Sequence, residues 1–294
     1  MSESSAKPRQ TELFVPVPAG AWDTHFHVFD APERAQPAAG TPYVPPDAPM
    51  PKLDAMHRYL GIDRGVMVQS AAVRADYGRF VEQLRSNPRL RGVVRATEDL
   101  SDRHLEELHA AGVRGVRFAF ARYMKQERPS IAAIQKMADR VKALGWHLKL
   151  HVDSSDLQEL RDMLRSTTVP VLIDHAANVK PASGVGHADF RLLLELHQRD
   201  NCWVLLGNFD RWSESGRPLF LDAIPLARAI IRNAPERVIW GTDWPHPMYR
   251  NPYSQGEPAP DERELLNLVA EAAERDGATI ERILVRNPLR LYGT

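Results

Sequence analysis

The sequence predicts a (β/α)8 barrel, in which eight parallel strands alternate with eight helices around one core. Apolar segments of strand length alternate with amphipathic segments of helix length from residue 21 to the C-terminus, as repeated βα units require. The chain also has 294 residues and 43% hydrophobic content, which suffices for one large core, and such barrels use about 250 residues as a single domain. We therefore expect one barrel domain over residues 21–294.

Eight segments are expected to be strands, because they are mostly apolar, as strands covered on both faces must be. In chain order they are Trp22–Phe29, Arg64–Gln69, Gly92–Ala96, Val113–Phe118, Trp146–Val152, Val169–Asp174, Cys202–Gly207 and Arg237–Gly241. The main competitor, a doubly wound open sheet, would need a Gly-rich phosphate-binding turn after the first strand. No such turn follows Phe29.

The segments between the strands carry the start and stop signals of helices. Ser130–Leu144 is the clearest example, with a serine N-cap, apolar residues at helical spacing and Gly145 as a stop. The other expected helices are Tyr77–Ser86, Ser101–Ala111, Ser155–Arg165, Asp189–Arg199, Leu219–Asn233, Asp261–Glu274 and Thr279–Arg286, after which Asn287-Pro288 closes the chain.

Two segments are expected to lack regular structure. Residues 1–20 are polar and lack the apolar core of about 7 to 15 residues that marks a secretory signal, so we expect a surface arm there. Residues 31–51 contain seven prolines, and a loop of this length at a barrel mouth is usually functional.

Charge and cysteine content narrow the partners and the location. The 38 basic residues balance the 38 acidic ones, which leaves no net field to attract nucleic acid or a membrane surface and argues for a small-molecule partner. No run reaches the roughly 18 apolar residues of a membrane span. The single cysteine, Cys202, cannot form an internal disulfide, so we expect a cytoplasmic protein; a homo-oligomer is compatible with the sequence.

Polar residues stand at the ends of the expected strands, and barrel active sites lie at the carboxyl ends of strands. The two-residue period of a strand sends His25 and His27 to the same face. The later strand ends carry Gln69, Ser70, Arg117, His151, Asp174, His175, Asn208, Asp210, Arg211 and Asp243. A lone His-x-His is a weak signal, but four histidines and an aspartate together are stable only if they serve a metal, a substrate or one another.

The residue types indicate a catalytic metal site. Three imidazoles, from His25, His27 and His151, and the carboxylate of Asp243 suit one divalent ion, zinc in the first place, with one position left open for water. Asp243 is also the candidate base that takes the proton of the attacking water, and His175 the residue that orients that water or a carbonyl.

Two arginines stand near the ends of expected strands. Arg117 ends an apolar strand directly before Phe118, where a solvated face is not expected, and Arg211 follows the seventh strand. Arginine forks bind carboxylate or sulfonate oxygens bidentately. Arg74 and Arg122 fit a substrate contact and a surface ion pair equally well.

Three motifs resemble the amidohydrolase superfamily: Asp23-Thr24-His25-Phe26-His27, Ile173-Asp174-His175 and the stretch from Val238 through Gly241-Thr242-Asp243-Trp244-Pro245 to Pro247. Within that superfamily the chain is similar to the 2-pyrone-4,6-dicarboxylate lactonase group, over roughly Pro18 to Tyr292. The resemblance implies an amidohydrolase-like barrel that opens a lactone carrying anionic groups, during the breakdown of aromatic compounds. It implies that Arg117 and Arg211 hold those anions, and it places Tyr43, Ser70 and Arg122 among the substrate contacts.

Two departures from that group bear on metal and substrate. By the same resemblance, the pyrone lactonases that work without a metal have a tyrosine at the position of His151. Because this chain has a histidine there, we predict a bound divalent ion. The resemblance itself leaves metal-free catalysis open. Tyr123 stands where the group has an arginine. The substrate is therefore left open between a pyrone dicarboxylate and a sulfonate-bearing muconolactone.

Two other functions compete with lactone hydrolysis: a metal-dependent, non-oxidative decarboxylase of an aromatic-derived acid on the same barrel, and a silent binding protein. Decarboxylation releases carbon dioxide, whereas lactone opening releases one proton at neutral pH. Lys149 and Cys202 are expected to be structural, and several histidines are expected at the surface or in loops: His57, His104, His109, His187 and His197. Arg74, Tyr123, His246, Tyr249 and Arg250 receive no role.

Overall fold

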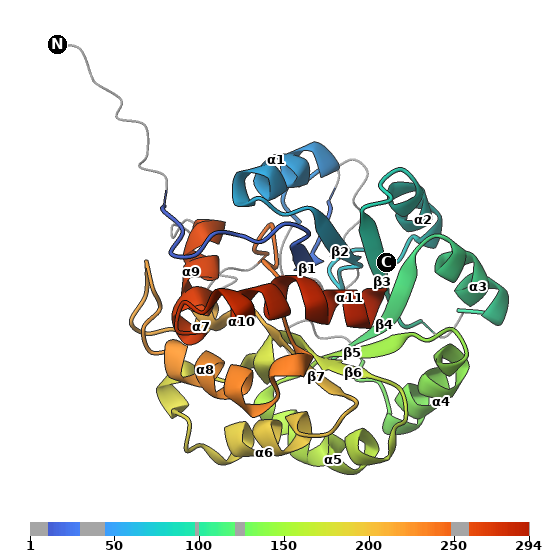
Figure 1. Ribbon diagram of the computed structural model, residues 1–294. Coiled ribbons are helices and arrows are strands. Elements are labelled where there is room, and N and C mark those ends of the chain that lie inside the picture. Colours follow the sequence, from blue (N-terminus) through green and yellow to red (C-terminus); the bar gives the residue numbers. More distant parts are fainter. Residues whose placement is uncertain (1–10, 30–44, 98–99, 121–126, 248–258, 294) are drawn as a thin grey trace.

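A computed structural model describes residues 11–29, 45–97, 100–120, 127–247 and 259–293 of the chain. Eight parallel strands form one sheet in chain order (Figure 1), which confirms the predicted barrel. They are β1 (Trp22–Phe26), β2 (Arg64–Val68), β3 (Leu90–Arg95), β4 (Val113–Ala119), β5 (His147–His151), β6 (Val171–Ile173), β7 (Cys202–Leu206) and β8 (Val238–Trp240). Each matches a predicted segment, with ends shifted by a few residues.

Helices cover the outside of the sheet (Figure 1). They are α1 (Met50–Leu60), α2 (Tyr77–Arg85), α3 (Asp102–Ala110), α4 (Ile131–Lys142), α5 (Leu157–Ser166), α6 (Ala188–His197), α7 (Phe209–Trp212), α8 (Ile224–Asn233), α9 (Glu262–Ala272), α10 (Gly277–Glu281) and α11 (Asn287–Tyr292). Short 3-10 or π segments are η2 (Ser154–Asp156), η3 (Asp174–Asn178), η4 (Pro181–Ser183), η5 (Pro235–Arg237) and η6 (Arg282–Arg286). In the ranges that the structure describes, no helix is both long and apolar enough for a membrane span.

Helix α1 was not predicted, and the helical segment at the C-terminus was predicted to end too early; both lie at prolines. The proline-rich stretch was expected to be loop as far as Pro51, yet α1 begins at Met50 with Pro51 in its first turn, where a missing N–H costs nothing. At the C-terminus the helical segment that begins at Gly277 does not stop at Asn287-Pro288. It continues through η6 into α11, and Pro288 again occupies a first turn.

Hydrogen bonds that the Asp23 side chain accepts join β1 to the segment that follows β8. The Asp23 carboxylate accepts bonds from the backbone N–H of Thr242 (3.0 Å) and from its hydroxyl (2.6 Å). Beyond it, the N–H of Asp243 donates to the carbonyl of His25 at 2.8 Å. Gly241 permits this close approach, since an added Cβ would lie 2.5 Å from the backbone nitrogen of His25. These contacts between β1 and the segment after β8 bring Asp243 close to His25 and His27.

The amino ends of the strands are covered by the C-terminal helix α11, which crosses the barrel in Figure 1. Its Tyr292 stacks on Trp22 at the start of β1, with ring centroids 6.0 Å apart, and meets the edge of His147 at the start of β5. Trp22 and Tyr292 belong to an apolar cluster with the inward residues Val66, Leu172 and Ile239. The covered end leaves the carboxyl ends of the strands for a site, as in other barrels of this type.

Candidate active site

The polar residues predicted at the strand ends are buried together at the carboxyl end of the barrel. His25, His27, His151, His175 and Asp243 all have buried side chains. The backbone after three strands is unusual, because His175, Asn208 and Asp243 have φ values of 49°, 59° and 55°. Non-glycine residues rarely adopt this left-handed conformation, and they do so most often at functional sites.

His25, His27 and Asp243 form one group whose potential ligand atoms all lie within 4.8 Å of one another. Oδ1 of Asp243 is 3.6 Å from Nε2 of His25 and 3.4 Å from Nε2 of His27. The other ring nitrogen of each histidine has a fixed partner. Nδ1 of His25 lies 3.0 Å from Asp174, and Nδ1 of His27 lies 2.7 Å from the carbonyl of Val68.

These partners indicate which nitrogen carries the proton. A carboxylate and a carbonyl accept hydrogen bonds, so the Nδ1 atoms are the donors, and Nε2 of a neutral ring presents its lone pair. Burial lowers the pKa of His25 well below its ordinary value, which keeps that ring neutral, and its Nε2 is buried with no hydrogen-bond partner among the described residues. The lone pair on Nε2 of His25 thus lies close to Oδ1 of Asp243, which is also near Nε2 of His27, an arrangement that fits a divalent cation.

Asp174 contacts His25 on the side of the ring away from Asp243, a contact that the sequence did not reveal. Its Oδ1 accepts from Nδ1 of His25 and lies 3.3 Å from Nζ of Lys149. Its Oδ2 accepts from Nε of Arg117 at 3.0 Å and from the neighbouring guanidinium nitrogen at 2.9 Å. Burial raises the pKa of Asp174, but His25, Lys149 and Arg117 outweigh that effect and hold the pKa well below its usual value. Asp174 is therefore an ionised carboxylate that fixes the orientation of His25.

The ammonium group of Lys149 balances the negative charge of Asp174. Its side chain is fully buried, and burial lowers the pKa of Lys149 to about 8. The expected structural role agrees with this position, because the ammonium group contacts Asp174 and lies beneath the histidines rather than among them.

His151 and His175 lie beside the group. The ring of His175 is 4.6 Å from that of His25, and His175 joins His25 and Asp174 in a second group of potential ligands. The ring of His151 stands edge-on to His175 at 5.5 Å, and His151 belongs to neither of the two ligand groups found in the described part of the chain. Burial lowers the pKa of His175 to about 4 and that of His151 well below its ordinary value, so both imidazoles are neutral.

The predicted substrate residues have different surroundings. Arg211 lies in α7 and donates a hydrogen bond to Oδ2 of Asp243. Burial by itself would raise the pKa of Asp243. The opposing effects of Arg211 and, next in size, of His27 are larger in sum and hold that pKa well below its usual value. Ser70 is buried, and its hydroxyl accepts from the N–H of Ala72 at 3.1 Å. Tyr43 and Arg122 lie outside the described residues, as do Tyr123, Tyr249 and Arg250.

Two histidines that were expected at the surface or in loops are buried instead. His57 lies on the inner face of α1, and its Nε2 is 3.2 Å from Oδ2 of Asp23. His197 lies in α6, within 3.2 Å of the carbonyl of Arg237. His57 could have been recognised from its place three residues before Leu60 and four after Leu53, which puts all three on one helical face.

Comparisons with known proteins show which family the chain resembles. A family model described as Amidohydrolase matches residues 22–294. A 4-sulfomuconolactone hydrolase from Rhizobium radiobacter is 36% identical over 286 residues, which cover 97% of this chain and 94% of that protein. A 2-pyrone-4,6-dicarboxylate hydrolase from Comamonas testosteroni is 33% identical over 285 residues, covering 94% of this chain and 91% of that protein.

Solved structures show the same fold. The apo crystal structure of a protein from Agrobacterium tumefaciens superposes with a TM-score of 0.78 at 24% sequence identity. The match covers 94% of this chain and 97% of that one.

Proposed function

The chain belongs to the amidohydrolase family, and we propose that it hydrolyses a lactone ring carrying anionic groups, in the breakdown of aromatic compounds. Its similarity to lactone hydrolases extends over nearly the whole chain, and the family resemblance predicted from the motifs is confirmed. One observation carries the proposal. Oδ1 of Asp243 faces Nε2 of both His25 and His27 at the open end of the barrel, while Arg211 holds Oδ2.

His25, His27 and Asp243 are the proposed ligands of one divalent ion, with zinc as the preferred metal because two imidazoles and a carboxylate suit it. The buried, unpartnered Nε2 of His25 supports this fit. When bound, such an ion supplies Lewis-acid polarisation and makes water acidic near neutral pH. His151 is kept as a fourth candidate ligand from the sequence, although it lies outside the ligand group.

The side chains around the ion have separate roles in lactone opening. Asp243 accepts a proton from the attacking water as the water oxygen bonds to the lactone carbonyl carbon. The bond between that carbon and the ring oxygen then breaks, and the ring oxygen, which leaves as an enolate from a pyrone or as an alkoxide from a muconolactone, takes the proton back from Asp243. His175 is neutral, so its ring can donate one hydrogen bond to orient the water or the carbonyl. Arg117 and Arg211 remain charged and attract the anionic groups of the substrate.

Product analysis tests the proposal against the decarboxylase alternative. With 2-pyrone-4,6-dicarboxylate at pH 7.5, we expect the purified protein to release about one proton per molecule of lactone opened, because a carboxylic acid forms and ionises. A pH-stat measures the protons, and trapping of carbon dioxide in base provides the control. Release of carbon dioxide in proportion to substrate loss would contradict lactone hydrolysis.

A further inference from the structure

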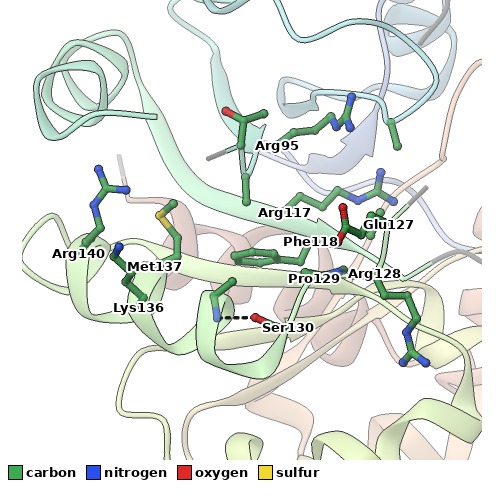
Figure 2. A pocket seen from close by; sticks show the side chains of 15 residues that line it. Arg95, Arg117, Phe118, Glu127, Arg128, Pro129, Ser130, Lys136, Met137 and Arg140 are labelled. Carbon is green, nitrogen blue, oxygen red and sulfur yellow. Dashed lines mark hydrogen bonds between the residues drawn. The ribbon is translucent and has the colours of Figure 1, made fainter. Parts of the chain in front are cut away.

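A cavity of about 790 Å³ lies between the ends of β3 and β4 and one side of α4 (Figure 2). This volume is within the range of roughly 300 to 1,000 Å³ that is typical of small-molecule sites. Phe118, Pro129 and Met137 give it an apolar surface that suits a flat ring. Arg117 also lines it, so the cavity adjoins the site through the same side chain that binds Asp174.

The charged lining of the cavity is mainly basic. Among the described lining residues there are four arginines, one lysine and one glutamate: Arg95, Arg117, Arg128, Arg140, Lys136 and Glu127. Three of the arginines form ion pairs with carboxylates that do not line the cavity. The pairs are Arg117 with Asp174, Arg128 with Asp156 and Glu159, and Arg140 with Asp102. Arg95 has no ion-pair partner among the described residues, and its guanidinium group donates a hydrogen bond to the carbonyl of Val73 at 3.0 Å.

Arg95 and Arg117 occupy the same register on neighbouring strands, where they are direct partners in the β3–β4 pairing. Figure 2 shows the two side chains running in the same direction along the cavity. Arg117 is paired with the carboxylate of Asp174, whereas no described carboxylate forms an ion pair with Arg95. Burial, and to a smaller extent Arg117, lowers the pKa of Arg95. An anion between the two guanidinium groups would remove this repulsion and satisfy the free N–H donors.

The first turn of α4 adds to the positive field. Ser130 caps this helix of 12 residues by accepting from the N–H of Ala133, and both residues line the cavity. The amino end of a helix carries partial positive charge, which favours an anion.

We propose that the cavity is the subsite for the anionic ring substituent of the lactone, and that Arg95 is the residue that binds this substituent. The subsite rests on the proposed lactone hydrolysis for its substrate. Its chemistry is recognition of an oxyanion bonded directly to the lactone ring, such as the sulfonate of 4-sulfomuconolactone or a ring carboxylate of a pyrone dicarboxylate, by the guanidinium group of Arg95 beside an apolar surface. Arg95 stands one strand away from Arg117, so it would supply the second cation for a dianionic lactone.

Replacement of Arg95 by methionine tests the subsite with paired substrates. For 4-sulfomuconolactone we expect Arg95→Met to raise KM about 10- to 100-fold with little change in kcat, since a charge-assisted hydrogen bond used in binding is lost. For muconolactone, which lacks the sulfonate, KM should stay within about twofold of the wild type, and Arg95→Lys should recover part of the loss. The same assay on 2-pyrone-4,6-dicarboxylate shows whether a ring carboxylate takes the place of the sulfonate.

Arg91→Met is the matched control, because Arg91 lies on the same strand but donates to the carbonyls of Pro88 and Leu90. We expect no change in either KM. Equal rises of KM for both muconolactones in Arg95→Met, or no rise for either, would overturn the subsite.

A binding measurement separates the subsite from the proposed reaction. Calorimetric titration with 4-sulfobenzoate needs no turnover, and Arg95→Met should weaken this binding about 10- to 100-fold. If the wild type opens no lactone but binds 4-sulfobenzoate through Arg95, the subsite stands and the proposed function fails. Unchanged 4-sulfobenzoate binding in Arg95→Met would contradict the subsite directly.

Discussion

Asp243→Asn should reduce kcat for lactone opening by about 10²- to 10⁴-fold, the contribution expected of a general base. The amide keeps the shape of the side chain but cannot accept the proton of the attacking water. It also weakens the ligand group, since Oδ1 of Asp243 faces the Nε2 atoms of both His25 and His27. Steady-state kinetics with 4-sulfomuconolactone measures the effect, and circular dichroism verifies that the variant is folded.

The matched control is Asp139→Asn, which makes the same change on an exposed position of α4. Its kinetics should equal those of the wild type. Asp243→Asn with wild-type kcat would remove Asp243 from the chemistry and leave it a purely structural partner of Arg211.

Asp174→Asn is expected to have two effects that a second substitution can separate. Zinc affinity should fall about 10- to 100-fold, as is typical when the hydrogen-bond partner of a ligating histidine is lost. The free energy of unfolding should fall by about 3 to 5 kcal/mol, because Lys149 and Arg117 are left as buried cations without their carboxylate. Competition with a chromophoric chelator measures the first quantity, and urea denaturation measures the second.

The double variant Asp174→Asn/Lys149→Met removes one of those stranded cations. Its stability should recover in part, whereas zinc affinity should stay low, because the charged partner of His25 is still missing. If zinc affinity recovered together with stability, Asp174 would be a structural residue and the orienting role would be wrong.

The barrel was predictable because each βα unit carries its own local signals. A segment such as Ser130–Leu144 contains its cap, its apolar face and its stop, and α4 forms within those bounds. Helix α1 was missed altogether, because it follows a proline-rich stretch and proline is read as a helix breaker unless its place in the first turn is known. The division into an arm over residues 1–20 and one barrel domain stays a prediction.

The candidate site was predictable where strand parity decides, as for His25 and His27, and where a strand ends in a carboxylate, as for Asp243. The pairing of Asp174 with His25, Arg117 and Lys149 joins residues far apart in the chain. Only barrel closure and register bring them together, and a sequence pattern carries no signal for either. The contact of Arg211 with Asp243 is of the same kind.

The central claim is that His25, His27 and Asp243 hold a divalent ion that lactone opening requires. The most direct measurement is ultraviolet-monitored opening of 4-sulfomuconolactone by protein as purified, after chelator treatment, and after zinc is restored, with metal content determined on the same samples. We predict that activity is lost with the metal and returns as about one zinc per chain is bound. Full activity in protein shown to be free of metal would contradict the claim.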